Sequence, residues 1–236
     1  LNSDNRSFKY YSSFYNYLSS SRGGDLNNML KFDDGTMYTF VLGDTQNNQS
    51  RWIQEFDGSN NLTSKVEQQW DFMLMTWANS MKYVYTYSSS NMKETMITQH
   101  WDGTSAWITD SKNTYTYNAA GKLSQDDFAL WDGVSAYVLA SQKLYYYDGS
   151  GHLVSETWQD IVGGSPVSTN RVNYTYTTSG KLQSTTNGTW NGVAWVDVDM
   201  YANTYDTSGR RTSELHSIND GTVFVNDMMR LFSNFS

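Results

Sequence analysis

Apolar and polar residues alternate along much of this chain, and the alternation is organised into a phrase of about thirty residues that keeps returning. Each phrase holds an aromatic-x-aromatic triplet, a small polar turn with glycine, an apolar residue, and Trp-Asp-Gly or a related triplet. One copy runs through Tyr115-Thr116-Tyr117, Gly121, Leu123 and Trp131-Asp132-Gly133. Alternation of this kind predicts β-strands, and a fixed period predicts an array of similar units.

The second aromatic of the triplet marks the same point in every unit. It falls near 17, 56, 87, 117, 147, 176 and 205, with the last unit ending near 235, so the first step is 39 residues and the later steps are 29 to 31. The Trp-Asp-Gly landmark follows the same spacing. Seven units therefore fill nearly the whole chain, and we predict one β-repeat domain over residues 1–236. The longer first unit places its extra residues in 18–24 or 43–50, which have loop composition.

The glycine of the phrase indicates how one end of each unit turns. In Asp148-Gly149-Ser150-Gly151 the spacing suits a type I turn that ends in a left-handed residue and a β-bulge. Gly121, Gly180 and Gly209 occupy the position of Gly151, and Asn91 replaces glycine in an earlier unit. The opposite end turns through Asp-Gly or Asn-Gly between two large aromatic residues, which can pair across the strands.

These signals predict an all-β fold, an antiparallel up-and-down meander of about seven two-stranded units. The segment 195–202 places Val196, Val198, Met200 and Ala202 on one face and two acidic residues on the other, as in a half-buried strand. The segment 181–187 is polar on both faces, so the core should be thin. We expect an elongated, twisted or coiled, largely single-layer sheet, with a closed β-barrel as the alternative.

Composition narrows the function classes. Aromatic residues are 16% of the chain, the net charge is −8, and no run of Lys or Arg exists, so nucleic acid is not an expected partner. No stretch approaches the roughly 20 apolar residues of a membrane-spanning helix, and we expect a chain that does not span a membrane. The absence of cysteine excludes disulfides and thiolate chemistry.

The turn phrases resemble a known repeat family. Tyr145-Tyr146-Tyr147-Asp148-Gly149-Ser150-Gly151-His152-Leu153 and Thr204-Tyr205-Asp206-Thr207-Ser208-Gly209 resemble the Tyr-Asp-x-x-Gly-x-Leu core of YD/RHS repeats. The longer phrase, with Trp-Asp-Gly, is similar to tandem repeats of secreted and cell-surface proteins of Bacteroidota, often exported by the type IX system. The resemblance covers almost the whole chain and implies an extracellular or cell-surface scaffold. The period here is near thirty, against the low twenties of RHS repeats.

Catalytic chemistry finds little support. His100, His152 and His216 occupy unrelated positions of the repeat, where structural or surface roles are expected. Asp126-Asp127, or Asp197 with Asp199 on one strand face, could supply the paired carboxylates of a glycosidase, but a solvated sheet face produces the same pattern. No phosphate loop, nucleophile elbow or metal motif is present. We expect no enzyme, no cofactor and no metal.

Two function classes remain. The first is a structural, display or adhesion scaffold at the cell surface or outside the cell. The alternative is a carbohydrate-binding module, in which exposed aromatic rings stack on sugars while Asn, Asp and Thr bind hydroxyl groups. Its partners would be glycans or other surface and secretion-system proteins. The candidate glycan-contacting residues are the aromatics beside the Asp-Gly turns: Trp101, Trp107, Trp131, Tyr137, Trp190 and Trp195.

Overall fold

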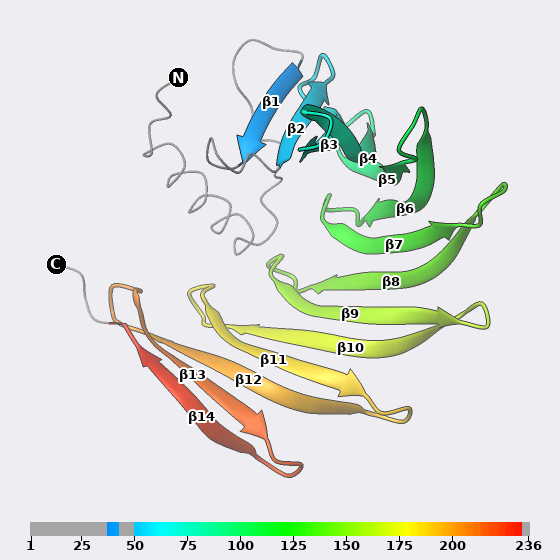
Figure 1. Ribbon diagram of the computed structural model, residues 1–236. Helices are drawn as coiled ribbons and strands as arrows, with labels where there is room; N and C mark the ends of the chain where they lie inside the picture. Colours follow the sequence, from blue (N-terminus) through cyan, green and yellow to red (C-terminus); the bar gives the residue numbers. More distant parts are fainter. Residues whose placement is uncertain (1–36, 43–49, 233–236) are drawn as a thin grey trace. The chain divides into compact units, whose positions relative to one another are not determined.

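The computed structural model describes residues 37–42 and 50–232, and these residues form β-strands joined by short loops (Figure 1). The strands are β1 (Met37–Leu42), β2 (Ser50–Phe56), β3 (Leu62–Asp71), β4 (Thr76–Tyr87), β5 (Lys93–Trp101), β6 (Trp107–Tyr117), β7 (Leu123–Trp131), β8 (Tyr137–Tyr147), β9 (Leu153–Val162), β10 (Ser165–Tyr176), β11 (Leu182–Trp190), β12 (Trp195–Tyr205), β13 (Arg211–Asn219) and β14 (Phe224–Leu231). The expected turn near 17, the end near 235 and the loop residues 18–24 and 43–49 lie outside the described residues.

Strand order in the sheet is the order of the sequence, so each strand lies beside the one that precedes it. Neighbouring strands run antiparallel, as in the pairing of β7 with β8 and of β8 with β9. The all-β meander is therefore confirmed. The order ends in two separate edge strands, β1 and β14, so the sheet is open and the closed-barrel alternative is wrong.

The strands group into two compact units, each of which contains more than one of the thirty-residue repeat units. The first contains β1 to β4, Lys93 and residues 98–108, and the second contains residues 94–97 and 109 onward, with β7 to β14 complete. Whether the chain acts as one domain stays a prediction, as does an elongated form.

The glycine end of each unit has the expected geometry. Phe56, Tyr87, Tyr117, Tyr147, Tyr176 and Tyr205 are the last residues of their strands. The turn glycines are left-handed, with φ between 71° and 83° for Gly121, Gly151, Gly180 and Gly209, and Asn91 adopts φ 58° in their place. A register shift lies just before each of the four glycine turns, for example between Thr116 and Tyr117. The left-handed residue and the bulge predicted for this turn are confirmed, and its assignment to type I stays a prediction.

The aromatic end of each unit is a longer loop than a tight turn. Between Trp131 and Tyr137 the five residues 132–136 close through a hydrogen bond from the Asp132 amide to the Ala136 carbonyl, 2.9 Å long. Among the described strands only β9 and β10 are joined by a two-residue turn, and Gly163 and Gly164 both have positive φ there, 59° and 81°. Two positive φ values fit the twist of a tight hairpin.

A second β-bulge, present in the hairpins β3–β4, β7–β8, β9–β10, β11–β12 and β13–β14, changes which residues share a face. Asn187 pairs with Asp199, whereas its neighbour Gly188 pairs with Asp197, so Val198 is the extra residue. Adjacent residues of β11 point to opposite faces, and Asp197 and Asp199 therefore do so too. The prediction that these two carboxylates share a face is wrong, and so is the common face proposed for Val196, Val198, Met200 and Ala202.

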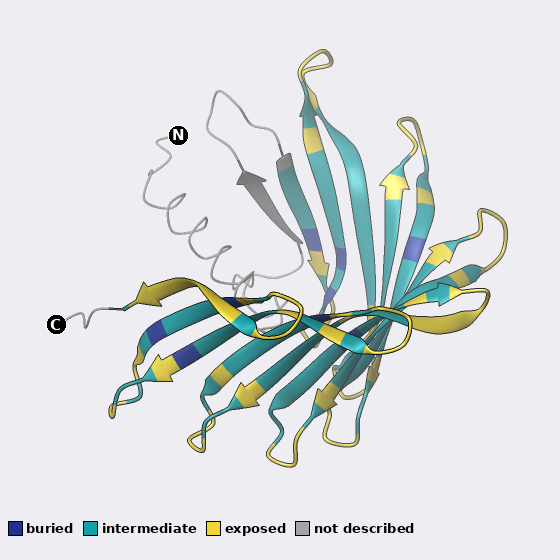
Figure 2. Cartoon of the chain, turned by 90° about the horizontal axis from the view of Figure 1, so that it is seen from below, coloured by how far each residue is buried: buried dark blue, intermediate teal, exposed yellow. Residues whose placement is uncertain are grey.

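The core is as thin as the polar strand centres indicate. Among the described residues Leu62 is the single large apolar side chain that is buried, at 3% exposure. The other buried side chains are polar: Gln54, Ser64, Ser111, Thr157, Asn203, Ser213 and Ser217. Figure 2 shows most strand residues half-buried and the loops exposed. A single-layer sheet explains this pattern, because each face is only partly covered by its own side chains.

Candidate functional site

The six predicted aromatic residues form pairs across the loops. Ring centroids are 5.1 Å apart in Trp101–Trp107, 5.0 Å in Trp131–Tyr137 and 5.4 Å in Trp190–Trp195, with edge-on packing. The cross-strand pairing is confirmed, and Trp70–Trp77 adds a fourth pair at 5.2 Å. All of these rings are half-buried. Whether they contact a glycan stays a prediction.

Acidic side chains organise the loops between the paired rings. Asp102 Oδ1 accepts the backbone amides of Thr104, Ser105 and Ala106 at 2.7, 2.8 and 3.1 Å. These hydrogen bonds lower the pKa of the Asp102 carboxyl to about 2, because they favour its charged form. Asn191 performs the same role with an uncharged amide oxygen, 2.9 Å from the amide of Val193. The Asp of Trp-Asp-Gly is thus a loop-forming residue.

Tyrosine hydroxyls link neighbouring strands at the glycine end. The hydroxyl of Tyr147, at the end of β8, donates to the carbonyl of Leu123, at the start of β7, over 2.9 Å. The same bond recurs at Tyr87–Leu62, Tyr176–Leu153 and Tyr205–Leu182, with distances of 3.0, 2.8 and 2.7 Å. In these four cases the second aromatic of the triplet therefore ties a repeat unit to the one before it.

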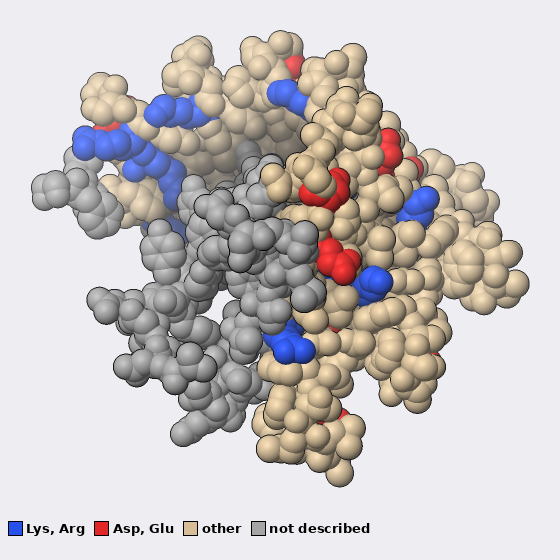
Figure 3. Space-filling model, turned by 90° about the horizontal axis from the view of Figure 1, so that it is seen from above, with Lys and Arg blue, Asp and Glu red and all other residues tan. Residues whose placement is uncertain are grey.

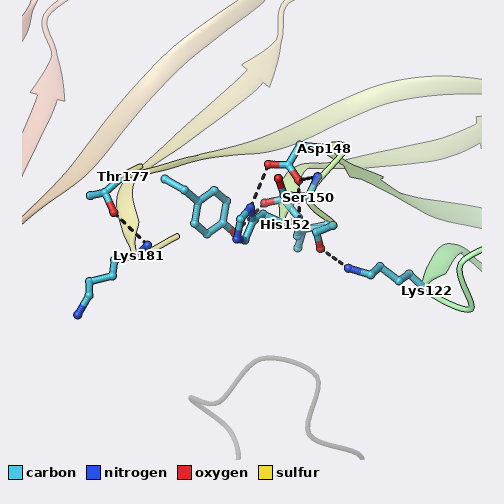
Figure 4. A network of polar contacts seen from close by, with 9 residues as sticks. Lys122, Asp148, Ser150, His152, Thr177 and Lys181 are labelled. Atoms are coloured by element: carbon cyan, nitrogen blue, oxygen red, sulfur yellow. Dashed lines mark hydrogen bonds and ion pairs between the residues drawn. The ribbon is translucent and has the colours of Figure 1, made fainter. Parts of the chain in front are cut away.

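The residue after the turn glycine binds the following unit. Lys122 Nζ donates to the Gly151 carbonyl (Figure 4) and lies 5.2 Å from the Tyr147 ring. Lys181 Nζ likewise donates to the Gly209 carbonyl and lies 5.4 Å from the Tyr205 ring. His152 takes this place in the unit between them. Its ring stacks on Tyr176 at 4.6 Å, and Nδ1 lies 3.0 Å from Asp148 Oδ2. Structural roles for His152 and Lys122 follow from this equivalence.

A groove of about 410 Å³ crosses β9 to β12 within the second compact unit. Trp158 forms one wall. Asn170 pairs with Thr189 and Val172 with Asn187, so these alternate residues of β10 and β11 lie on one face. The rest of the lining is Arg171, Gly188 and, at the bulge, Val198. The Asn187 amide nitrogen donates to Asp199 Oδ1 over 2.6 Å, which fixes its orientation. The groove thus combines an aromatic ring with amide and hydroxyl groups.

A charged network holds the Trp158 ring from the other side. Lys143 Nζ lies 4.4 Å from the centre of this ring and 3.2 Å from Glu156 Oε2, which also accepts the Tyr174 hydroxyl at 3.2 Å. The Tyr145 ring lies 4.8 Å from the same ammonium. Burial, and then the charges of Asp126 and Glu156, raise the pKa of Tyr145. Lys143 does not line the groove, which extends from Trp158 over β10 to β12.

Sequence reasoning did not select Trp158. It lies in the middle of β9, whereas the six selected residues flank loops. One signal was available, since Trp158 has no Asp-Gly after it and no aromatic partner four to seven residues further on. The bulge at Val198, which shapes the far side of the groove, left no recognisable sequence signal.

Charge is dispersed on the surface. On the face shown in Figure 3 most of the surface is uncharged, with Lys and Arg in separate groups. Several cations are paired, as in Arg171–Asp197 at 3.1 Å and Arg211–Glu214 at 2.9 Å. Within residues 37–42 and 50–232 there is no helix long and apolar enough to cross a membrane.

Comparison with known proteins finds similarity among solved structures. No protein-family model and no curated protein matches the chain. A protein of unknown function from Bacteroides fragilis aligns with a TM-score of 0.46 and 14% identity, over 56% of this chain and 96% of its own. A DUF3836 family protein from Parabacteroides distasonis gives 0.30 and 17%, over 35% and 76%. The Tc holotoxin pore of Photorhabdus luminescens gives 0.47 and 17%, over 80% of this chain and 9% of that chain.

Proposed function

We propose that this protein is a non-catalytic repeat scaffold that acts outside the cell or at its surface, in a structural, display or adhesion role. The observation that carries the proposal is the bond from each triplet tyrosine to a backbone carbonyl of the preceding unit, seen in Tyr87, Tyr147, Tyr176 and Tyr205. A backbone acceptor is present whatever side chain the neighbour carries. Units can therefore diverge in sequence and still join.

The contacts on the glycine side support the same role. Lys122, His152 and Lys181 each contact the ring of the next unit, at 5.2, 4.6 and 5.4 Å. With a largely polar interior, stability must come from such unit-to-unit contacts and from strand pairing, as in linear repeat proteins. The resemblance to YD/RHS and Bacteroidota surface repeats supports the extracellular location.

Surface labelling on the producing cells tests this function. We expect protease or a membrane-impermeant amine label added to intact cells to reach the chain, and deletion of one unit, residues 115–144, to leave a folded protein at the same location. Recovery of the chain only from the cytoplasm would contradict the proposal. Unfolding of the deletion variant would contradict the repeat-scaffold part of it.

Carbohydrate binding is a second candidate, and the Trp158 groove is the observation that favours it. An indole face beside amide and hydroxyl groups suits a sugar, whose apolar face stacks while its hydroxyls form hydrogen bonds. Asn170, Asn187 and Thr189 line the groove and carry no charge, and the charge of Arg171, which also lines it, is paired with Asp197 at 3.1 Å. A neutral oligosaccharide is therefore the matching ligand. This site differs from the six loop aromatics.

Titration with a panel of neutral oligosaccharides tests the groove. We expect Trp158→Ala to weaken binding about tenfold or more, because a stacked ring contributes on the order of 1 to 3 kcal/mol. Trp195→Phe is the matched control, since that ring lies in a loop pair. Equal losses in both variants, or no binding by the unaltered chain, would rule out the groove as the sugar site.

A further inference from the structure

One loop of the first compact unit differs in composition from the other described loops at the aromatic end of the repeats. Between β3 and β4 the residues Phe72, Met73, Leu74 and Met75 are 61%, 93%, 73% and 69% exposed. The equivalent loops in the described chain are residues 102–106, 132–136, 163–164, 191–194 and 220–223, and each carries at most one large apolar side chain, a valine. Exposed apolar clusters of this kind mark contact surfaces.

Local hydrogen bonds hold the backbone of this loop in a defined conformation that leaves the apolar side chains exposed. Asp71 Oδ1 accepts the amides of Met73 and Leu74 at 2.8 and 2.9 Å, so two loop amides are satisfied from within. Met75 adopts φ 51°, a left-handed conformation that glycine or asparagine adopts with less strain. The other left-handed residues of the described chain are glycine or asparagine, so this position carries an apolar side chain despite the strain.

The base of the loop carries rings suited to an interface. Trp70 pairs with Trp77 directly below the apolar residues, with centroids 5.2 Å apart, and Arg51 lies 4.8 Å from the Trp77 ring. Indole rings favour the boundary between hydrocarbon and water, and a guanidinium there can meet lipid phosphates. The order from the tip inward is therefore apolar side chains, then Trp, then a cation.

We propose that the loop 72–75 inserts into the surface of a lipid bilayer. All four side chains are more than 60% exposed at the tip of one loop. Lipid surrounds such a tip on every side, whereas one protein pocket would cover only part of it. The internal hydrogen bonds of Asp71 lower the cost of removing the loop amides from water. The inference is independent of the scaffold role, because it concerns one loop and not the unit-to-unit contacts.

Vesicle co-flotation tests the insertion. The full chain is mixed with vesicles of phosphatidylcholine, alone and with one-third phosphatidylglycerol, and compared with the variant Phe72→Ser, Met73→Thr, Leu74→Ser, Met75→Gly. We expect the unaltered chain to float with both kinds of vesicle. The variant should lose binding by about tenfold or more, because the strength of membrane binding follows the buried apolar area. The matched control is the variant Val134→Ser, which changes an exposed loop residue of the second compact unit. This variant should bind like the unaltered chain.

The remaining outcomes would overturn the proposal. Absence of binding to either vesicle by the unaltered chain, or equal flotation of the four-residue variant, excludes insertion of this loop. Sedimentation velocity identifies the competing occupant, because self-association that disappears in the variant without any vesicle binding would assign the loop to a second copy of the chain. Far-ultraviolet circular dichroism checks that the variant remains folded, and Met73→Ser with Leu74→Ser gives a milder variant if it does not.

Discussion

The hydroxyl of Tyr147 lies 2.9 Å from the carbonyl oxygen of Leu123, twenty-four residues earlier in the chain. The bond closes the glycine end of the β7–β8 pair, and its tyrosine also carries the Lys122 ammonium over its ring at 5.2 Å. Tyr147 thus contacts the preceding repeat unit through Leu123. It also contacts Lys122, whose ammonium group reaches the turn that follows Tyr147. Removal of the hydroxyl alone isolates the first contact from the second.

We expect Tyr147→Phe to lower the free energy of unfolding by about 1 kcal/mol, the usual net value of a partly buried hydrogen bond. The ring and its contact with Lys122 remain. Tyr146→Phe is the control, because Tyr146 is 50% exposed and points to the other face, and it should change stability little. Urea denaturation of both variants measures the difference, and equal effects would contradict a specific role for the Tyr147–Leu123 bond.

Replacement of turn glycines should separate backbone strain from side-chain crowding. Gly103 has φ 86° with open space around a Cβ, whereas at Gly151, with φ 83°, a Cβ would meet the Lys122 side chain. We expect Gly103→Ala to cost about 1 kcal/mol from strain alone and Gly151→Ala to cost more. In a Lys122→Ala background the excess at Gly151 should disappear. An excess that persists without Lys122 would show that the turn itself is the more sensitive element.

Much of the fold could be predicted from the chain because its signals are local. The left-handed residues at Gly121, Gly151, Gly180 and Gly209 follow from turn chemistry that four or five residues determine. The pairing of Trp101 with Trp107 follows from their spacing across one loop. Both features recur, so each unit supports the interpretation of the next.

The bulges and the groove could not be predicted in this way. The extra residue at Val198 is set by pairing with β11, and a single displaced residue reverses every face assignment beyond it. For that reason Asp197 and Asp199 were placed together and lie apart. Trp158 was missed because its role depends on Lys143, Asn170 and Asn187, which come from three other strands. The apolar residues 72–75 can be identified in the sequence, but they stand out only after this segment is recognised as a loop equivalent to the Asp-Gly loops.

The Asp102 loop predicts a specific pH dependence. Its pKa is about 2 in the folded chain against an ordinary value of 3.8, so the folded state favours the carboxylate. The resulting stabilisation is complete above about pH 4 and is lost as the pH falls toward 2. We expect the difference in stability between the unaltered chain and Asp102→Asn to shrink across this range. Asn191 shows that an amide can hold the loop, so the variant should fold at neutral pH.

Thermal unfolding at steps between pH 2 and 6 measures this difference. Asp220→Asn is a parallel case, because hydrogen bonds from Val223 and Thr222 lower the pKa of Asp220 in the same way. A stability difference that grows as the pH falls from 4 to 2 would have the wrong sign and would contradict the assignment of the charged form to the loop.

The aromatic pairs should be energetically coupled. For Trp190 and Trp195, with edge-on rings 5.4 Å apart, we expect a double-mutant cycle with alanine to give a coupling of about 1 kcal/mol. Trp131 with Trp195 is the control pair, since these rings belong to different hairpins, β7–β8 and β11–β12, and their coupling should be near zero. Equal coupling in the two pairs would indicate a general loosening of the sheet rather than a direct contact.

The bulge at Val198 makes the sharpest prediction about β12. Arg171 Nη2 is 3.1 Å from Asp197 Oδ1, while Asp199 on the other face accepts Asn187. An Arg171–Asp197 double-mutant cycle should therefore give a coupling of about 0.5 kcal/mol, as expected for a partly exposed ion pair, and an Arg171–Asp199 cycle should give almost none. A regular strand would place both carboxylates on one face, so Arg171 would couple to both. Comparable coupling energies in the two cycles would mean that the bulge is absent in solution, and the far wall of the Trp158 groove with it.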